Sequence, residues 1–211
     1  MFKKIVLATH NAHKLEEVRA ILAPLGIEVL GGDEVGLKDV PETGTTFEEN
    51  SRLKARAAFD QIGLPVLADD SGLCITALNG KPGLHSARFA KEHGGYPAVF
   101  DKVWQLLKDK SDWSAYFICC MVLKTGPNPA DEHVFIGKMM GKIAPRASGT
   151  HLFGYDPIFI PDGYQDTCGV LEPEIKNRIS HRAKALEKLK VFLVWWSAVG
   201  VALGTTPPGL S

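Results

Sequence analysis

Short apolar runs alternate along the chain with segments in which apolar residues recur every three or four positions. Residues 5–8 form such a run, as expected for a strand that is buried on both faces. The segment 12–25 then places three leucines and a valine on one helical face, and Gly26 follows where a helix-ending glycine belongs. Residues 27–30 form the next apolar run. A strand, a helix and a strand in this order predict a βαβ unit with two parallel strands.

The pattern continues with elements of both kinds. Thr46 followed by Glu49 is a capping box, which predicts a helix over 47–61 that ends near Gly63. The other expected elements are strands at 65–68, 116–123, 134–140 and 158–160, a helix at 99–107, and a last helix from Pro173 with Ile175, Ile179, Leu186 and Leu189 on its inner face. Together they predict a mixed α/β fold, as one elongated domain of residues 1–190 with two lobes.

An apolar stretch follows this domain, VFLVWWSAVGVALG at 191–204, within an atypical tail of residues 191–211. A membrane span needs roughly 20 apolar residues, so the stretch is too short by several. We expect an extension of the last helix, packed on the core or on a partner subunit. A non-native C-terminus and a membrane anchor are the alternatives.

The charge balance excludes some classes of partner. The 24 lysine and arginine residues equal the 24 aspartate and glutamate residues, so no global basic field favours duplex nucleic acid or an anionic membrane. A locally basic pocket for a small anion remains compatible with this balance. The four cysteines form no C-x-x-C pair, which favours buried free thiols in a reducing compartment. We therefore expect a cytoplasmic protein.

The first candidate site lies between the first strand and the first helix, at Thr9-His10-Asn11-Ala12-His13-Lys14. Free amides and the helix dipole favour anions at such a position, and Lys14 adds a mobile positive charge. This predicts a site that binds phosphate, and a polar, N-capped helix start is the alternative. His10 and His13 are expected at the edge of the pocket or on the surface.

The second candidate site is Asp69-Asp70, at the expected end of a strand. Adjacent carboxylates disfavour joint ionisation unless a cation neutralises them, and Mg²⁺ prefers carboxylate oxygen. A metal-held water beside a carboxylate provides a nucleophile and its base. A β-turn rich in aspartate, serine and glycine is the alternative.

Two further segments carry aromatic and basic residues. Phe153-Gly154-Tyr155-Asp156 precedes a strand, and its glycine allows a ligand to approach the backbone while a ring stacks on it. Lys176, Ser180 and Arg182 are expected near one helical face beside His181, where such donors suit phosphate or a purine O6. A plain strand start and a solvated basic helix face are the alternatives.

Together these segments resemble the inosine/xanthosine triphosphate pyrophosphatase family, the Ham1-like proteins. The resemblance covers residues 4–189 and rests on five motifs in order. They are ATHNxxK from Ala8, ETGTTFEENSRLKARAA at 42–58, LADDSGLCITALNGKPGLHSAR at 67–88, FGYDPIF at 153–159 and KNRISHRAKAL at 176–186.

The resemblance implies a role for each matching residue. Asp70 would be the general base and, with Glu42 and the supporting Asp69, would hold Mg²⁺. The residues implied to contact substrate are Thr9, His10, Asn11, Ala12, His13 and Lys14 at the triphosphate, Ser71, then Phe153, Gly154, Tyr155 and Asp156 at the base and sugar, and Lys176, His181 and Arg182. The implied fold is an elongated α/β structure with a central substrate cleft between two lobes, as a homodimer.

The implied activity is hydrolysis of non-standard purine nucleoside triphosphates (ITP, dITP and XTP) to the monophosphate and pyrophosphate. A pyrophosphatase for another modified nucleotide and a nucleotide-binding sensor without turnover are the alternatives. The chain departs from the family pattern at His151-Leu152, Val170 and Ile175. We expect the bulk of His151-Leu152 to narrow the base pocket and to affect substrate range more than reaction type.

Overall fold

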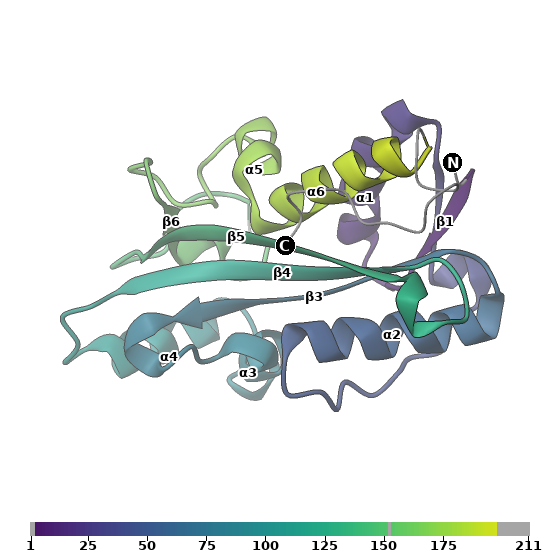
Figure 1. Ribbon diagram of the computed structural model, residues 1–211. Coiled ribbons are helices and arrows are strands. Elements are labelled where there is room, and N and C mark those ends of the chain that lie inside the picture. Colours follow the sequence, from purple (N-terminus) through teal and green to yellow (C-terminus); the bar gives the residue numbers. More distant parts are fainter. Residues whose placement is uncertain (1–2, 152, 198–211) are drawn as a thin grey trace. The chain divides into compact units, whose positions relative to one another are not determined.

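The computed structural model describes residues 3–151 and 153–197, and it divides the chain into two compact units. Unit 1 comprises Met1–Asp70, Cys120–Gly137 and Lys184–Ser211, and unit 2 comprises Ser71–Cys119 and Lys138–Ala183. The boundaries fall inside three strands and one helix, so these elements contribute to both units (Figure 1).

In the described residues, six strands form one sheet in the order β2-β1-β3-β4-β5-β6. Their bounds are β1 Lys4–Leu7, β2 Glu28–Gly31, β3 Val66–Ile75, β4 Ser114–Lys124, β5 Glu132–Ile143 and β6 Phe159–Pro161. β1 pairs in parallel with β2 and with β3, whereas β5 and β6 are antiparallel. The sheet is therefore mixed, and the predicted mixed α/β fold is confirmed.

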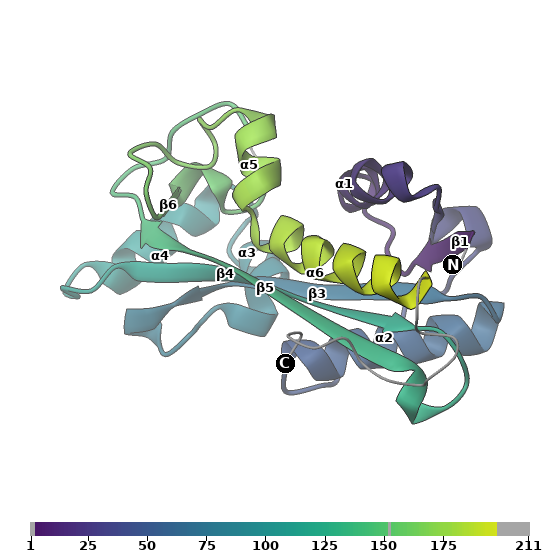
Figure 2. The same ribbon diagram turned by 45° about the horizontal axis from the view of Figure 1, so that its top comes forward.

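Unit 1 begins with the predicted βαβ arrangement. α1 (Ala12–Leu22) joins β1 to β2 through a short 3-10 turn, and Gly26 has the left-handed φ of 69° that ends this segment. α2 (Phe47–Ile62) begins where the Thr46 hydroxyl accepts the amide of Glu49 at 3.1 Å. Figures 1 and 2 show α2 on one side of the strands of this unit, with α1 and the last helix, α6, on the other. A core of aliphatic side chains lies between α2 and the strands.

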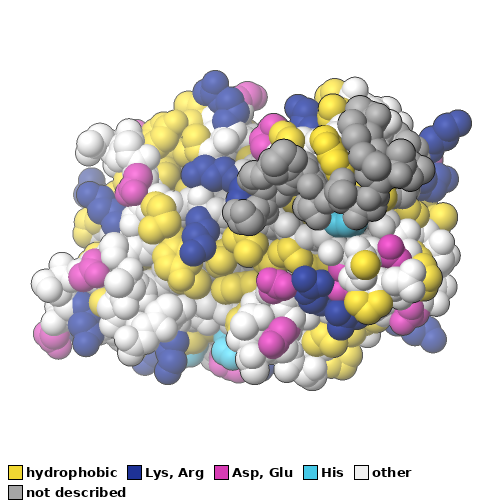
Figure 3. Space-filling model, in the orientation of Figure 1, with side chains coloured by type: hydrophobic (Ala, Val, Ile, Leu, Met, Phe, Trp, Pro, Cys, Tyr) yellow, Lys and Arg dark blue, Asp and Glu magenta, His cyan; other side chains and the backbone are white. Residues whose placement is uncertain are grey.

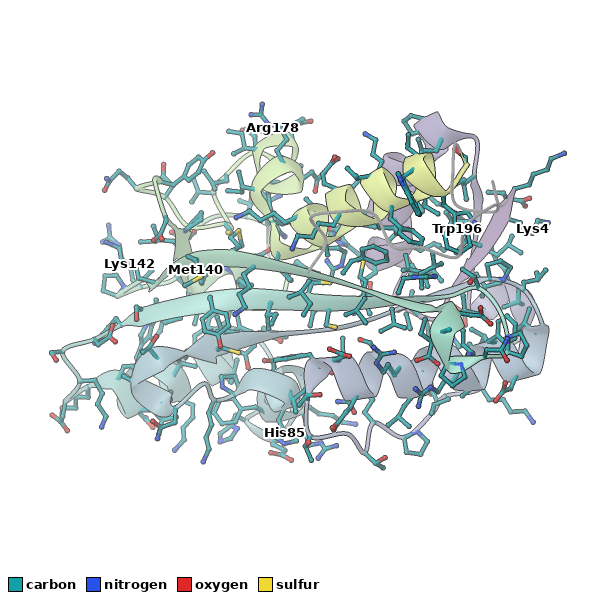
Figure 4. All side chains as sticks on the ribbon, in the orientation of Figure 1. Lys4, His85, Met140, Lys142, Arg178 and Trp196 are labelled. Carbon is teal, nitrogen blue, oxygen red and sulfur yellow. The ribbon has the colours of Figure 1, made fainter. Side chains whose placement is uncertain are left out.

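Unit 2 has its own core next to α3 (Ser86–Glu92) and α4 (Ala98–Leu107). These two helices lie on one side of its strands, and α5 (Pro173–Ile179) lies on the other (Figure 1). β5 alternates strictly between buried and exposed positions in this unit. Lys138, Met140 and Lys142 are exposed on it, and Figure 4 shows the last two on the strand. On the face shown in Figure 3, hydrophobic side chains lie among lysine and arginine side chains over β4 and β5.

The last predicted helix is wrong in one respect, because it is two helices. α5 ends at Ile179, and Ser180 has an extended backbone with ψ 155° before α6 (His181–Trp195) begins. The Ser180 hydroxyl accepts the amide of Ala183 at 3.0 Å, so this serine caps the start of the second helix. The expected single face that carries Lys176, Ser180 and Arg182 therefore does not form.

Within the described residues, 191–195 continue α6, as a helix extension predicts. Phe192 and Leu193 are each 1% exposed and belong to the core of unit 1, whereas Val191 and Val194 are about half exposed. Leu152 and residues 198–211, which hold the rest of the apolar stretch, lie outside the described residues. Among the described helices, none is long and apolar enough to cross a membrane. All four cysteines are buried free thiols, as expected.

Candidate active site

The loop after β1 is organised by its own polar side chains. The Thr9 hydroxyl accepts the amide of Asn11 at 3.2 Å, and the Asn11 side chain accepts the amide of Lys14 at 3.2 Å as the N-cap of α1. The polar, N-capped helix start, which was the alternative interpretation of this segment, is therefore observed. It does not exclude a phosphate site, because a helix N-terminus presents several amides and a favourable dipole.

This loop borders a cavity of about 490 Å³ in unit 1. The cavity is lined by Ala8, Thr9, His10, Asn11, Lys14, Leu37, Lys38, Asp39, Val40, Glu42, Lys54, Ala58 and Asp69. Predicted phosphate-site residues and two of the predicted carboxylates therefore meet in one space. Ala12, His13 and Asp70 do not line it, and His13 instead lies 3.5 Å from Glu17.

His10 lies at the edge of this cavity and is paired with acids. Its Nδ1 is 2.5 Å from Asp33, and its Nε2 is 3.4 Å from Asp39. The hydrogen bond to Asp33 raises the pKa of His10 above its usual value. The expected position at the pocket edge is confirmed.

Asp69 and Asp70 lie within β3, which continues to Ile75, so the expected strand end and the alternative β-turn are both wrong. Successive strand residues point to opposite faces, and this separates the two carboxylates. Lys14 donates to both carboxylate oxygens of Asp69 at 2.9 Å. Asn50, on α2, donates to Asp70 at 3.0 Å. Each buried acid therefore has a polar partner from a different helix.

Asp70 is 6% exposed, and its burial raises the pKa of its carboxyl. The negative charges of Glu42 and Asp69 act in the same direction, whereas Lys54 and the hydrogen bond from Asn50 oppose them. A carboxylate with a raised pKa is a better proton acceptor near neutral pH than an exposed aspartate. This environment suits the expected general base.

Lys54 is a site residue that the sequence reasoning missed. Its Nζ donates to Glu42 at 2.7 Å and to the backbone carbonyl of Asp69 at 2.5 Å. Burial lowers the pKa of Lys54, but the charges of Asp69, Asp70 and Glu42 outweigh it, and the net direction is upward. The available signal was the spacing of Asn50 and Lys54, because polar residues four apart share one helical face.

Glu42, Asp69 and Asp70 have the donor chemistry that Mg²⁺ prefers. No group of three or more potential ligand side chains among the described residues is already arranged to hold an ion. Mg²⁺ is commonly bound by one or two carboxylates together with substrate phosphates and water, so a complete protein cage is not required. The negative charge of Glu42 raises the pKa of Asp70, and a cation beside both would relieve this repulsion. These residues fit the expected ion.

In unit 2 the segment Phe153–Asp156 is brought together with Lys176 of α5. Lys176 forms an ion pair with Asp156, and its Nζ lies 5.2 Å from the centroid of the Phe153 ring. Gly154 has a positive φ of 59°, which a side chain disfavours, and the Tyr155 hydroxyl donates to the Ser86 carbonyl at 2.9 Å. An aromatic ring, a carboxylate and an ammonium group therefore form one cluster.

His181 and Arg182 lie in the first turn of α6 and are only 8% and 4% exposed. The His181 ring stacks on Phe117 with centroids 5.0 Å apart. The alternative of a solvated basic helix face is therefore wrong for these two residues. Ser71 is half-buried on β3, and His151 is exposed with its amide donating to the Gly169 carbonyl at 3.0 Å.

The acidic and lysine-rich cavity of unit 1 and the aromatic, cationic cluster of unit 2 are the features of an enzyme that acts on a phosphorylated compound. The sequence profile of the Ham1 family matches residues 5–192. The chain is 43% identical over 192 residues to the dITP/XTP pyrophosphatase of Coxiella burnetii, covering 90% of this chain and 96% of the relative. It is 44% identical over 191 residues to the enzyme of the same name from Streptomyces coelicolor, covering 88% and 94%.

The structural comparison agrees. A HAM1 protein from Coxiella burnetii superimposes with a TM-score of 0.84 at 42% identity, covering 92% of this chain and 99% of the other. The Ham1 protein of Staphylococcus aureus superimposes with a TM-score of 0.82 at 38% identity, covering 91% and 98%. The chain belongs to the Ham1 family.

Proposed function

We propose that this chain hydrolyses the non-standard purine nucleoside triphosphates dITP, ITP and XTP to the monophosphate and pyrophosphate. Relatives named dITP/XTP pyrophosphatase, more than 40% identical over nearly the whole chain, support this substrate class. The structural observation that carries the proposal is the cavity of unit 1, where Lys14 and Lys54 meet the carboxylates Glu42 and Asp69 at the N-terminus of α1. This enzyme cleanses the nucleotide pool.

The triphosphate binds at the cavity of unit 1. Lys14 is already held at the cavity by Asp69 and needs only to turn toward a phosphate oxygen to stabilise it. Thr9 and Asn11 order the backbone there, so that the amides at the start of α1 are fixed before substrate arrives. Such preorganisation stabilises charge that develops on the leaving group without further rearrangement.

Asp70 accepts the proton of the attacking water. The water oxygen bonds to the α-phosphorus, the bond from that phosphorus to the bridging oxygen breaks, and pyrophosphate leaves with the bonding electrons. Glu42 and Asp70, supported by Asp69, would hold Mg²⁺. The ion supplies neutralisation of the triphosphate charge when it is bound.

The residues of unit 2 recognise the base and sugar, with Ser71 in contact with substrate. The Phe153 ring offers a stacking surface, and Asp156 and Lys176 offer polar contacts beside it. His181 and Arg182 supply donors for a purine O6. An adenine amine at this position would leave buried donors unpaired, and such a site discriminates by up to about 10⁴-fold.

The test is pyrophosphate release from a panel of dITP, ITP, XTP, dATP, dGTP, dCTP and dUTP with Mg²⁺, each repeated with excess chelator. We expect the three non-standard purines to react at least about a hundredfold faster than dATP, and the chelator to abolish turnover. Faster hydrolysis of dCTP or dUTP would assign the chain to a pyrimidine nucleotide. Tight dITP binding without pyrophosphate release would make it a sensor.

We further propose a cytoplasmic homodimer. The four buried free thiols are consistent with a reducing compartment. Val191 and Val194 on α6 and Met140 on β5 are large apolar side chains exposed in the single chain, and a partner subunit would cover such positions. Light scattering on the purified protein at micromolar concentration tests the assembly, and a monomer mass would contradict it.

A further inference from the structure

Asn50 joins two parts of the candidate site through its side-chain amide. It lies in the first turns of α2 and is 3% exposed. Its Oδ1 accepts the backbone amide of Gly44 at 2.8 Å, and its Nδ2 donates to Asp70 Oδ2 at 3.0 Å. Because a backbone amide only donates, Gly44 determines which end of the side chain is oxygen, and the nitrogen must then face Asp70.

The segment that carries Glu42 packs tightly onto this helix turn. A Cβ at Gly44 would lie 2.7 Å from Asn50 Oδ1 and 2.7 Å from the Cβ of Glu49, so only glycine allows this approach. The Thr45 amide donates to the Glu49 carboxylate at 2.6 Å. Two hydrogen bonds and a close contact therefore hold the loop that follows Glu42 against α2.

Glu42 itself is connected to the same helix. Lys54, four residues after Asn50, donates to Glu42 at 2.7 Å. Two side chains on one face of α2 therefore contact the carboxylates, because Asn50 donates to Asp70 and Lys54 donates to Glu42. Asn50 also accepts the amide of Gly44, which lies in the loop that follows Glu42. The two carboxylates come from separate segments, and α2 is the element that relates their positions.

We infer that Asn50 is a positioning residue, which sets the separation of Glu42 and Asp70 and so prearranges them for a divalent cation. The inference rests on the proposed function for the role of that cation. Aspartate at this position has no donor for Asp70 unless it is protonated, and serine is too short to reach both partners. Removing a residue that orients metal ligands lowers metal affinity by about 10–100-fold.

The experiment measures Mn²⁺ binding to the ligand-free protein by electron paramagnetic resonance, for the wild type, Asn50→Ala and Gly44→Ala. Gly44→Ala disturbs the contact between Gly44 and Asn50 from the side of the loop and leaves Asn50 in place. The control is Ser51→Ala, because Ser51 is also fully buried on α2 and donates to the Cys120 carbonyl at 2.8 Å, away from the carboxylates. Melting temperatures and rates of dITP hydrolysis are recorded for each protein.

We expect Asn50→Ala and Gly44→Ala to bind Mn²⁺ at least about tenfold more weakly, and Ser51→Ala to stay within about twofold of wild type at a similar loss of stability. If Asn50→Ala does not fold, Gly44→Ala decides. Unchanged Mn²⁺ affinity in the folded variants, an equal loss in Ser51→Ala, or no Mn²⁺ binding by the wild type overturns the inference. A wild type that binds Mn²⁺ but does not hydrolyse dITP contradicts the proposed function instead.

Discussion

Glu132 on β5 pairs with three cationic side chains, and its replacement tests how much this cluster stabilises the fold. Its side chain is 1% exposed. Arg52 contacts it at 2.6 Å, Arg56 at 2.7 Å and Lys124 at 3.3 Å. Burial raises the pKa of Glu132, but these three cations outweigh it and lower the pKa from 4.5 to about 2.

The size of the effect follows from this change in pKa. At about 1.36 kcal/mol for each unit of pKa, the ionised form of Glu132 stabilises the folded state by about 3 kcal/mol. Because the folded-state pKa is depressed, this stabilisation is fully present above pH 4.5 and is lost as the pH falls toward 2. Glu132→Gln also leaves three cations close together, two of them poorly exposed, which brings the expected loss at pH 7 to about 3–5 kcal/mol.

The assay is urea denaturation of wild type and Glu132→Gln at pH 7 and at pH 3. We expect the difference in the free energy of unfolding to fall by about 2 kcal/mol between these pH values, since less of the ionic stabilisation remains at pH 3. The control is Glu28→Gln. Glu28 forms an exposed ion pair with Lys4 at 3.1 Å, and its loss should lower the free energy of unfolding by less than about 1 kcal/mol. The reasoning would be refuted if wild type and Glu132→Gln differed in their free energy of unfolding by less than about 1 kcal/mol at pH 7, or by the same amount at both pH values.

Three further predictions concern the site and the last helix. Asp70→Asn should lower kcat for dITP by about 10²–10⁴-fold with little change in melting temperature, and a residual rate above a tenth of wild type would remove its role as base. Lys176→Met should raise KM for dITP and lower the melting temperature, because it leaves Asp156 buried without its ion pair; steady-state kinetics and calorimetry check both effects, and unchanged values would contradict them. Phe192→Ala should lower the free energy of unfolding, measured by urea denaturation, by about 3–5 kcal/mol, whereas Val191→Ala, at an exposed position, should change it by less than about 0.5 kcal/mol. Equal effects of the two substitutions would contradict the burial of this face of α6.

The amino-acid sequence alone determined those elements whose signals are local. The helix that starts after Thr46 and ends at Gly63 forms as predicted, because the cap and the left-handed glycine act within a few residues of the helix they bound. The Glu49 carboxylate also accepts the amide of Thr45 at 2.6 Å, a contact that the sequence did not predict. The family motifs were likewise readable, because they are contiguous runs of residues.

Tertiary structure decided what depends on partners far along the chain. Asp69-Asp70-Ser71-Gly72 has the composition of a turn, yet it continues β3, because neighbouring strands pair with it and distant helices supply Lys14 and Asn50 to its buried acids. Ser180 interrupts an apparently continuous helical pattern, since its hydroxyl caps α6 and leaves α5 to end one residue earlier.

Lys54 and Asn50 show the same limit within the candidate site. In the sequence they are two polar residues on an amphipathic helix, where solvent exposure is the usual outcome. Folding places Glu42, Asp69 and Asp70 beside that face, where Lys54 donates to Glu42 and to the Asp69 carbonyl and Asn50 donates to the buried Asp70. Which polar residues become buried partners depends on which charges the fold brings to them, and the order of residues along one helix does not contain that information.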